Sequence, residues 1–332
     1  MKLPRKGRSG IASPYSAGVS KVAPKLKRQL FFTTLASLAA FVSAMLRSEH
    51  RHNNLSWSDV SKQVIDWMNV DVIGVNWFST YRVHHRVADR FRAGRAFLLG
   101  DAAHIHSPVG AQGMNTSIGD AVNLAWKLAA ALRHKANPSI LDSYERERIA
   151  FARRLVATTD QVFTGVTRAG LIARVIRLRI VPFLLPLLFG FRPVRRLLFR
   201  TVSQIAVNYR GSTLNRGRAG KLRGGDRLPW ISSADLDSDN FAPLRSLDWQ
   251  IHIYGNVSPE IQQLCEERQM PLHVFRWRRE MSRSGFERDA VYLVRPDGYL
   301  AVAARGDDSE QLSAYLEAHQ IKSIRVAEKV PA

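Results

Sequence analysis

The sequence predicts an α/β protein with more than one buried core. Two observations support this prediction: a short apolar run precedes a long amphipathic stretch near residue 100, and strand-like runs alternate with helical ones over the last hundred residues. With 332 residues, 45% of them hydrophobic and 23% charged, the chain is long enough for several cores. Cys265 is the only cysteine, which excludes an intrachain disulfide and any paired-cysteine redox or zinc site.

The formal net charge of +21 is concentrated in two segments. Residues 1–55 contain ten Lys/Arg and one acid, and residues 165–225 contain thirteen Lys/Arg and no acid, so the remainder is close to neutral. Neither segment carries a known nucleic-acid-binding motif, and their few aromatic residues are not interleaved with the basic ones. We therefore expect no nucleic-acid partner, although a basic protein that binds nucleic acid or a membrane surface stays as an alternative.

The N-terminal region predicts no catalytic element. Its first 28 residues are rich in Lys, Arg, Gly, Pro and Ser and are predicted to be disordered. Residues 30–46 form an uncharged run after a basic segment, as in a secretory signal. The run is slightly short for a bilayer span, and we favour a buried helix. We expect a cytoplasmic protein. Helical spacing after residue 57 and a β-rich run over 72–83 follow.

The sequence predicts one strand and two helices over residues 96–159. Residues 96–99 form a short apolar run, predicted to be a fully buried strand that ends at Gly100-Asp101. The first helix follows Asn115, and its apolar stripe is expected to lie against a core. That stripe consists of Ile118, Ala121, Val122, Ala125, Leu128, Ala129 and Leu132. The second helix is predicted over 139–159, with Glu145, Arg146, Glu147 and Arg148 in its exposed turns.

The rest of the chain predicts a connector and a separate C-terminal unit. Prolines interrupt residues 165–210, which favours short kinked amphipathic helices with apolar faces packed on the protein itself. Residues 211–225 contain five glycines and are predicted to be a linker. Strands over 249–254, 272–277, 292–294 and 299–303, with helices capped by Ser258 and Asp308, give a βαββα order typical of a thioredoxin-like domain.

The segment from Gly100 to Asn115 is the candidate ligand site. A strand that ends at Asp101 delivers a carboxylate where ligands of α/β sheets bind, and this carboxylate can accept hydrogen bonds from a polyol. Gly110 and Gly113 let the backbone approach a flat ligand, and the start of the next helix favours an anion. A polyol, a flat ring and a developing negative charge together describe a reduced flavin.

The run GDAAHIHSPVGAQGMNTSIGDAVNLAWKLA resembles the second flavin-binding motif of the single-component FAD-dependent aromatic hydroxylases, a group that includes phenol, pentachlorophenol and 3-(3-hydroxyphenyl)propionate monooxygenases. The resemblance continues through residues 77–91 and 141–148, and through Tyr209-Arg-Gly-Ser212 and Gly225-Asp-Arg-Leu-Pro229, so that it covers about residues 57–325. A small departure is Ser117, where the family usually has glycine, and it is expected to crowd the flavin edge slightly.

The resemblance implies hydroxylation of a phenolic compound with FAD, NAD(P)H and O2. It places Gly100 and Asp101 at the FAD ribityl chain and the loop after them beside the isoalloxazine ring. The loop residues implied are Pro108, Gly110, Gly113, Met114 and Asn115. It also implies a homodimer that forms through the C-terminal region. The resemblance assigns no catalytic residue, and it leaves the substrate ring and the choice of NADH or NADPH open.

The implied fold is part of a p-hydroxybenzoate hydroxylase-like FAD-binding domain, a helical connector and a thioredoxin-like domain without redox cysteines. The corresponding ranges are 1–55 (basic arm and apolar segment), 56–90 (remnant of a substrate domain), 91–164 (FAD-binding part), 165–225 (connector and linker) and 226–332 (thioredoxin-like domain). The sequence contains no GxGxxG to hold the ADP pyrophosphate. We therefore expect an incomplete chain that retains little or no flavin, and a truncated, non-catalytic relative is the alternative.

A metal site is the remaining alternative at the same segment. Asp101, His104 and His106, with His84 or His85, carry side chains that metals bind, but their spacing matches no known ligand pattern. We expect no metal, and we expect His104 and His106 to be loop histidines held by the backbone or by flavin-side contacts.

Overall fold

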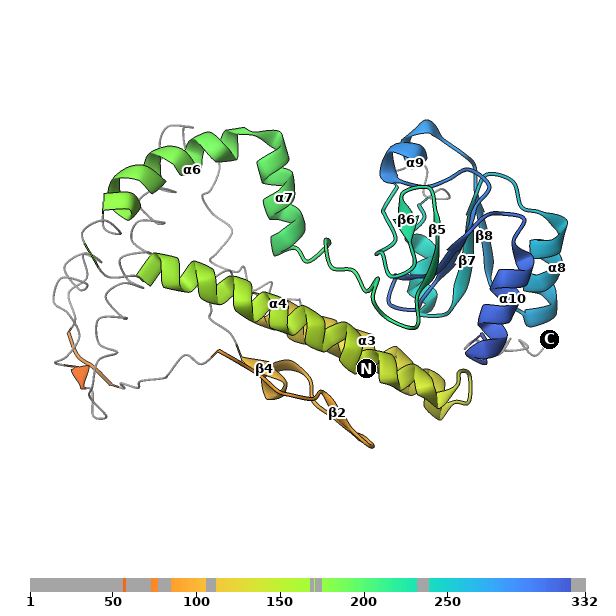
Figure 1. Ribbon diagram of the computed structural model, residues 1–332, viewed down its shortest axis with the longest axis horizontal. Coiled ribbons are helices and arrows are strands. Elements are labelled where there is room, and N and C mark those ends of the chain that lie inside the picture. The colour runs from red at the N-terminus through yellow and green to blue at the C-terminus, as the bar shows by residue number, and fades with distance from the viewer. Residues whose placement is uncertain are drawn as a thin grey trace, which may run out of the picture. The chain divides into compact units, whose positions relative to one another are not determined.

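The computed structural model describes residues 56–57, 73–76, 85–105, 112–167, 170, 175–231 and 239–323 (Figure 1). The chain forms two compact units, Met1–Tyr81 with Val166–Phe183 and Arg82–Gly165 with Leu184–Ala332. The candidate site lies in the second unit. The predicted arm, the apolar run 30–46 and most of the predicted elements between residues 57 and 83 lie outside the described residues.

Two short antiparallel pairs precede the first long helix. Strand β1 (Arg86–Val87) pairs with β4 (His104–Ile105), and β2 (Arg92–Ala93) pairs with β3 (Ala96–Phe97). A 3-10 turn, η2 (Gly100–Ala102), follows β3. The prediction of a fully buried strand over 96–99 is wrong, because β3 has only two residues and Leu98 and Leu99 after it are exposed.

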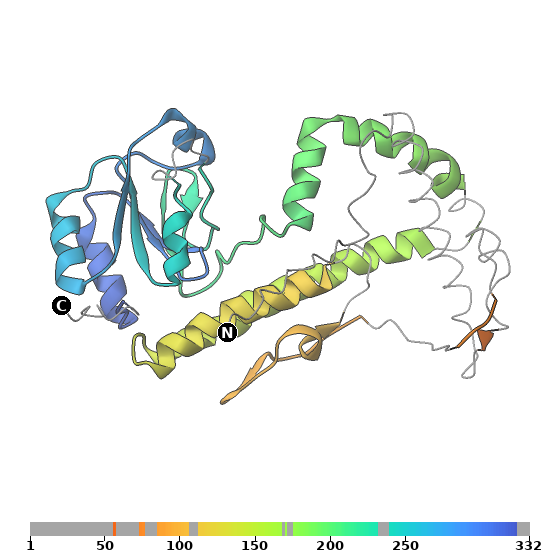
Figure 2. The same ribbon diagram turned by 180° about the vertical axis from the view of Figure 1, so that it is seen from behind.

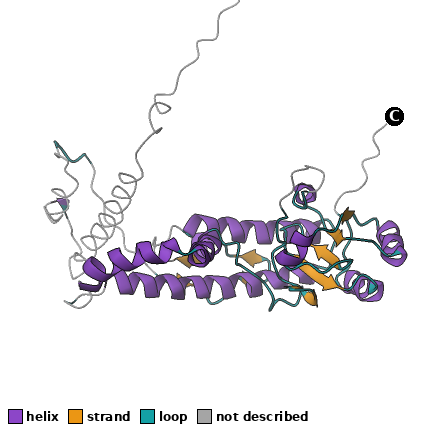
Figure 3. Cartoon of the chain, turned by 90° about the horizontal axis from the view of Figure 1, so that it is seen from above, coloured by secondary structure: helices purple, strands orange, loops and turns teal. Residues whose placement is uncertain are grey.

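Helices α3 (Gly113–Leu132) and α4 (Asp142–Thr167) form the next layer, joined by the short helix η3 (Pro138–Leu141). Figures 1 and 3 show the two long helices side by side. The Asn137 side chain accepts a hydrogen bond from Ser139 N, and Pro138 occupies the first turn of η3, so the second predicted helix starts as a 3-10 turn and becomes α-helical only at Asp142.

Most of the predicted apolar stripe of α3 does not lie against a core. Ile118 is 53% exposed, Val122 50% and Leu132 77%, so the prediction is wrong for these residues, whereas Leu128 is partly buried and packs against the apolar cluster that contains Leu124. The opposite side of the helix is buried instead and is largely polar. Its buried residues are Thr116, Asp120, Asn123, Leu124, Trp126, Lys127 and Ala130. The physical reason is electrostatic: the polar residues of this side find charged partners in α4 and in the C-terminal domain.

A run of helices connects α4 to the C-terminal domain. A π-helix (Ile176–Ile180) leads into α6 (Val181–Gly190), and α7 (Arg192–Val202) begins with a proline in its first turn. α7 agrees with the prediction of short amphipathic segments, whereas α6 has no polar side chain and is not amphipathic, and the expected packing of the apolar faces on the protein is wrong. Side chains that stay exposed include Phe183, Leu184, Leu187, Leu197, Leu198 and Phe199.

The C-terminal domain is built on a six-stranded sheet with the strand order β6-β5-β10-β9-β7-β8. The strands are β5 (Arg216–Ala219), β6 (Leu222–Arg223), β7 (Gln250–Tyr254), β8 (Leu272–Phe275), β9 (Val291–Val294) and β10 (Leu300–Ala304). The helices are α8 (Pro259–Arg268), α9 (Arg279–Ser284) and α10 (Ser309–Ala318). Figures 1 and 2 show α8 and α10 side by side on one face of the sheet.

The four predicted strands and the two capped helices of this domain are present, but the order from β7 to α10 is βαβαββα rather than the predicted βαββα, because α9 lies between β8 and β9. Strand β7 is parallel to β8 and antiparallel to β9, and β9 is antiparallel to β10. Ser258 caps α8 and Asp308 caps α10, as the sequence predicts, and Gly298 turns the β9–β10 hairpin with a φ of 76°. Cys265 on α8 is buried, and burial raises the pKa of its thiol to about 11.

The glycine-rich segment predicted as a linker contains β5 and β6 instead. A Cβ atom on Gly217 would lie 2.3 Å from Ala303 O, and one on Gly224 would lie 2.4 Å from Arg216 N. These glycines therefore allow backbones to pack closely, and they do not mark a flexible segment. The sheet begins before the predicted domain boundary at residue 226.

Candidate flavin site

The Gly100–Asp101 turn has a backbone shape that only glycine adopts easily. Gly100 has a φ of 59°, and a Cβ atom there would lie 3.1 Å from Ser117 Oγ in the first turns of α3. Ala103 N donates to Gly100 O at 2.9 Å, which closes the turn. The side chain of Asp101, the next residue, is exposed. The turn thus lies against the start of α3 and presents a carboxylate outward.

Asp120 of α3 fixes this turn. Its buried carboxylate accepts hydrogen bonds from Gly100 N at 2.9 Å and from Arg148 Nε at 2.6 Å, and it lies 2.7 Å from His104 Nε2. Burial by itself would raise the pKa of Asp120, but the hydrogen bond with His104 and the charge of Arg148 outweigh it and lower the pKa. Asp120 is therefore an ionised group that joins the turn, the strand β4 and helix α4.

Arg148 of α4 also binds a second group on α3 and a tyrosine that follows α7. Its Nη2 donates to Thr116 O at 3.1 Å, and its Nη1 donates to Tyr209 OH at 2.9 Å. The approach is close, because a Cβ atom on Gly119 would lie 3.1 Å from Nη2. The prediction that Arg148 lies in an exposed turn is wrong, and the same correction applies to Glu147, which is also buried.

Glu147 is the centre of a second buried charge cluster. It accepts hydrogen bonds from Asn123 Nδ2 at 2.7 Å and Lys127 Nζ at 2.8 Å, both on α3, and from both terminal nitrogens of Arg295 at 2.8 and 3.0 Å. The charge of Arg295 and then that of Lys127 outweigh burial and hold the pKa of Glu147 far below its usual range. Burial lowers the pKa of Lys127 to about 8 even though Glu147 opposes this shift.

This second cluster joins the two helices to the C-terminal domain. Arg295, just after β9, also donates to Asp297 Oδ2 at 2.7 Å, and Trp126 Nε1 donates to the same oxygen at 3.0 Å. The Trp126 ring meets Trp249 edge-on with 5.4 Å between ring centroids. Polar and apolar contacts therefore hold α3 and the thioredoxin-like domain together within the second unit.

The structure describes five of the seven predicted flavin-site residues. Gly100 and Asp101 form the turn, and Gly113, Met114 and Asn115 form the first turn of α3, against which Gly100 lies through Ser117. The side chains of Met114 and Asn115 are exposed, as is that of Asp101. Pro108 and Gly110 lie outside the described residues. The turn and the helix start that the sequence predicts to share a site are thus neighbours.

The chemistry of these residues fits one end of FAD. An outward carboxylate can accept hydrogen bonds from ribityl hydroxyls, and no side chain among the described residues caps the start of α3. Ser117 Oγ is occupied, because it donates to Gly113 O at 3.1 Å. The Ser117 side chain lies next to Gly100. Because glycine has no side chain, there is room for Ser117 at this position.

The described histidines of this region, His85 and His104, do not form part of a metal-ligand cluster. His104 is buried against Asp120 and also lies 6.1 Å, between ring centroids, from Phe91. Among the described residues, which include His85 but not His84 or His106, no three metal-ligand side chains lie together.

Within the same described ranges, no helix is both long enough and apolar enough to cross a membrane.

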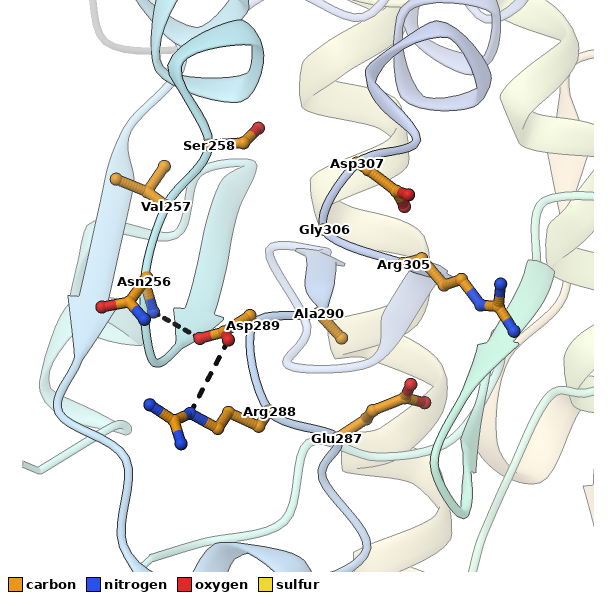
Figure 4. A pocket seen from close by; sticks show the side chains of 10 residues that line it. All are labelled: Asn256, Val257, Ser258, Glu287, Arg288, Asp289, Ala290, Arg305, Gly306 and Asp307. Atoms are coloured by element: carbon orange, nitrogen blue, oxygen red, sulfur yellow. Dashed lines mark hydrogen bonds and ion pairs between the residues drawn. The ribbon is translucent and has the colours of Figure 1, made fainter.

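An open hollow of about 380 Å³ lies elsewhere, on the thioredoxin-like domain (Figure 4). Residues 256–258, 287–290 and 305–307 line it, just before α8. Asp289 Oδ1 accepts a hydrogen bond from Asn256 N at 2.6 Å, and Arg288 pairs with Asp289 at 3.6 Å. Its charged groups are partly paired with one another, and it contains none of the predicted flavin-site residues.

Sequence reasoning missed the two charge clusters. Asp120, Asn123 and Lys127 follow one another at helical spacing on α3, and this polar stripe is the signal that could have revealed them. Arg295 carries no such signal, because its partner Glu147 is 148 residues away in the chain.

Comparisons with known proteins show which proteins this chain resembles. Residues 33–159 match the FAD binding domain family. The chain is related to flavin-dependent monooxygenases and is an α/β protein of the kind found in FAD-dependent aromatic hydroxylases. This agrees with the resemblance of the motif that begins at Gly100.

Three known proteins show how similar this chain is in sequence or structure and how much of each protein it covers. A flavin-dependent monooxygenase of Mycobacteroides abscessus is 34% identical over 257 residues, which are 75% of this chain and 46% of the relative. The dialkyldecalin synthase of Streptomyces rugosporus is 44% identical over 54% of this chain and 41% of its own. The solved structure of CabE, an aromatic hydroxylase from angucycline biosynthesis, aligns with a TM-score of 0.60 and 26% identity over 81% of this chain and 54% of that one. The chain thus spans about half the length of the relatives it matches.

Proposed function

We propose that this chain supplies the ribityl and ring side of the FAD site in a monooxygenase that hydroxylates a phenolic compound with NAD(P)H and O2. One observation carries the proposal: the Gly100–Asp101 turn is locked against α3 by Asp120, so that the Asp101 carboxylate projects outward from a rigid support. FAD, when bound, supplies the oxidation chemistry. The chain's residues would hold and orient it.

In this role, Asp101 accepts hydrogen bonds from the sugar-alcohol chain. The first turn of α3, with Gly113, Met114 and Asn115, lies where backbone N–H groups and the helix dipole favour negative charge on a reduced ring. Pro108 and Gly110 belong to the same proposal through their place in the motif. The names of the relatives support the reaction class, but a synthase among them shows that this fold also serves other chemistry.

The test compares two flavins that differ only in the sugar-alcohol chain. Riboflavin carries the ribityl group and lumiflavin lacks it, so fluorescence titration of each against the whole chain isolates the contribution of Asp101. We expect Asp101→Ala to weaken riboflavin binding by about tenfold, corresponding to one charge-assisted hydrogen bond, and to leave lumiflavin binding unchanged. Equal riboflavin affinity for the wild type and the variant would contradict the proposal.

The matched control is Asp142→Ala. Asp142 is also an exposed aspartate at the start of a helix, and it pairs with Arg92 rather than with the Gly100 turn. Riboflavin affinity should not change in this variant. The reaction itself is tested by following NADH and NADPH consumption and ring hydroxylation with a panel of phenols.

A second candidate function is binding to an anionic membrane surface, which α7 favours. No residue of α7 is buried; its apolar side chains Val194, Leu197 and Leu198 lie on one side, and most of the other side is arginine. Helices of this composition lie in the headgroup layer of anionic bilayers. Sedimentation with vesicles of phosphatidylserine and phosphatidylcholine tests this: binding should need phosphatidylserine and should weaken in Leu197→Ser. Equal recovery with pure phosphatidylcholine would contradict it.

A further inference from the structure

We infer that Tyr209 is a positioning residue, through which the thioredoxin-like domain holds the Gly100–Asp101 turn in place. Tyr209 lies between α7 and β5. It acts through Arg148 of α4, which binds the same carboxylate of α3 that accepts a hydrogen bond from Gly100 N. The inference rests on the proposed function, because it assigns a further residue to the same flavin site.

The Asp120 carboxylate connects the turn to Arg148. Its Oδ2 accepts a hydrogen bond from Gly100 N at 2.9 Å, and its Oδ1 accepts one from Arg148 Nε at 2.6 Å. The side chains of Arg148 and Asp120 are only 2% and 1% exposed. Hydrogen bonds between charged groups are short, and they are strong in a buried site. The orientation of the Arg148 guanidinium therefore sets the orientation of the carboxylate that fixes the turn.

Tyr209 holds the Arg148 guanidinium from outside the helix pair. Among the hydrogen bonds that Arg148 makes with the described residues, those to Asp120 and to Thr116 O both lead to α3. Another joins Arg148 Nη1 to Tyr209 OH at 2.9 Å. A guanidinium is planar, so donors fixed at Nε, Nη1 and Nη2 leave it one orientation. Loss of the Tyr209 hydroxyl would remove the support that comes from the C-terminal side.

The backbone of Tyr209 is fixed to the C-terminal domain. Tyr209 N donates to Gly225 O at 2.7 Å, and Asn215 Nδ2 donates to Tyr209 O at 2.7 Å. Gly225 N donates to Leu300 O of β10 at 2.6 Å. A Cβ atom on Gly225 would lie 2.5 Å from the carbonyl carbon of Tyr209, so the two backbones pack closely. Tyr209 is therefore tied to the sheet and not to the helix pair.

The ring of Tyr209 joins the two buried charge clusters. Its centroid lies 4.4 Å from that of the Tyr299 ring and 5.4 Å from the guanidinium carbon of Arg295. Arg295 binds Glu147, the residue before Arg148 on α4. The C-terminal domain thus holds α4 at two consecutive residues, and the contact at Arg148 is the one that leads on to the turn.

The first experiment measures how firmly the turn is held. Tyr209→Phe removes the hydroxyl and keeps the ring, so it tests the hydrogen bond to Arg148 alone. Hydrogen exchange of the whole chain without flavin is followed by mass spectrometry on a peptide that contains the Gly100 and Ala103 amides, both hydrogen-bonded in the turn. We expect these amides to exchange at least about threefold faster in the variant, as for a residue in a coupled network.

The matched control is Tyr292→Phe. Tyr292 on β9 is also a buried tyrosine of the C-terminal domain, and its hydroxyl accepts a hydrogen bond from Glu287 N at 2.8 Å. This variant loses the same group at a position that does not contact Arg148, so exchange in the turn should stay unchanged. Equal exchange in the wild type and Tyr209→Phe, or equally faster exchange in both variants, would overturn the inference.

The second experiment tests whether the link acts through Asp101. We expect Tyr209→Phe to weaken riboflavin binding by about threefold and to leave lumiflavin binding unchanged. In a chain that already carries Asp101→Ala, the same change should not alter riboflavin affinity, because the group that it positions is gone. An equal loss with and without Asp101 would show that Tyr209 only stabilises the fold, and it would overturn the inference.

The two experiments together separate the inference from the proposed function. Faster exchange of the turn in Tyr209→Phe alone, in a chain that binds riboflavin no better than lumiflavin, supports the link and contradicts the flavin site. Riboflavin binding that needs Asp101 but is the same in the wild type and Tyr209→Phe supports the flavin site and overturns the inference.

Discussion

The thioredoxin-like domain and the α3–α4 region differ in what they bury. In the domain, alternate residues of β7 and β9 point into two apolar clusters, one under α8 and α10 and one on the other face of the sheet. In the α3–α4 region, a smaller apolar cluster that includes Leu124 and Tyr144 lies beside two buried charge clusters. The domain is thus held mainly by apolar packing, whereas the α3–α4 region combines apolar packing with buried ion pairs and leaves much of the apolar side of α3 exposed.

The comparison is sharpest at Trp126 and Ala130. These two residues of α3 belong to the same apolar cluster as Trp249 and Ile251 of the domain, so the second half of α3 shares the domain's core. The first half of α3 is held by Asp120 and Arg148. Lys127, beside Trp126, pairs with Glu147, so the second half of α3 combines a buried ion pair with apolar packing, and substitutions of either kind should be felt there.

The largest expected effect comes from Glu147→Gln. This change leaves Lys127 and Arg295 in a buried site without their shared carboxylate, so we expect the free energy of unfolding to fall by about 3–5 kcal/mol. Urea unfolding followed by circular dichroism measures it. Glu260→Gln, at an exposed glutamate in the first turn of α8, is the control and should change little. A loss below about 1 kcal/mol for Glu147→Gln would mean that the cluster does not hold the two regions together.

A smaller but still large effect is expected from Gly224→Ala. The added Cβ atom would lie 2.4 and 2.5 Å from backbone atoms of Arg216, so the β5–β6 hairpin must shift, and we expect a loss of about 2 kcal/mol or more. Gly211→Ala is the control, because a Cβ atom at Gly211 would meet nothing within 4 Å. Equal unfolding midpoints for the two variants would show that this segment is a flexible linker after all.

An intermediate effect concerns the pH dependence of the domain. Burial and then the nearby His273 lower the pKa of His252 on β7 to about 3, below the value of about 6.5 that it takes in an unfolded chain. Between these values the unfolded chain binds more protons, so stability is full above pH 6.5 and falls as the pH drops, by up to about 1.4 kcal/mol per pH unit.

Replacement of this histidine should therefore flatten the acid side of the stability curve. We expect His252→Gln to reduce the slope of unfolding free energy between pH 4 and pH 6, and His134→Asn, at an exposed histidine with a φ of 53°, to leave it unchanged. Parallel slopes for wild type and His252→Gln would contradict the prediction.

The smallest effect is expected on the exposed apolar side of α3. Val122 is half exposed, so Val122→Glu should change the free energy of unfolding of the chain by less than about 0.5 kcal/mol. Leu124→Ala, two residues away on the buried side, should cost about 2 kcal/mol or more. Similar losses for both variants would mean that Val122 is covered within the chain itself.

Local signals in the sequence predict the C-terminal domain well. Ser258 before Pro259, the turn at Pro296-Asp297-Gly298 and the cap at Asp308 each act over a few residues, and the structure contains all three. The α3 helix is also correctly predicted, but its orientation is not. An apolar stripe identifies a helix face that needs covering, and it does not say whether the covering residues belong to the same chain.

The errors in the candidate site have a related cause. Glu147 and Arg148 look like exposed charges because they alternate in sign along one helix, and only contacts with Arg295 and Asp120 reveal that they are buried. The glycines around Gly217 have the composition of a linker, and only the approach of Ala303 shows that they pack tightly. Long-range contacts decided these positions, whereas the motif alone predicts a turn with a glycine at Gly100, and the structure has one there.

The buried thiol of Cys265 can report how often the apolar cluster around it opens. Its sulfur lies on α8 within the apolar cluster that also holds Trp126, and a thiol with a raised pKa is mostly protonated and slow to react. A thiol reagent can therefore modify the native protein only during transient opening of that cluster. The rate at which the reagent labels this single sulfur atom would report how often α8 and α10 separate from the sheet. No probe has to be introduced for this measurement.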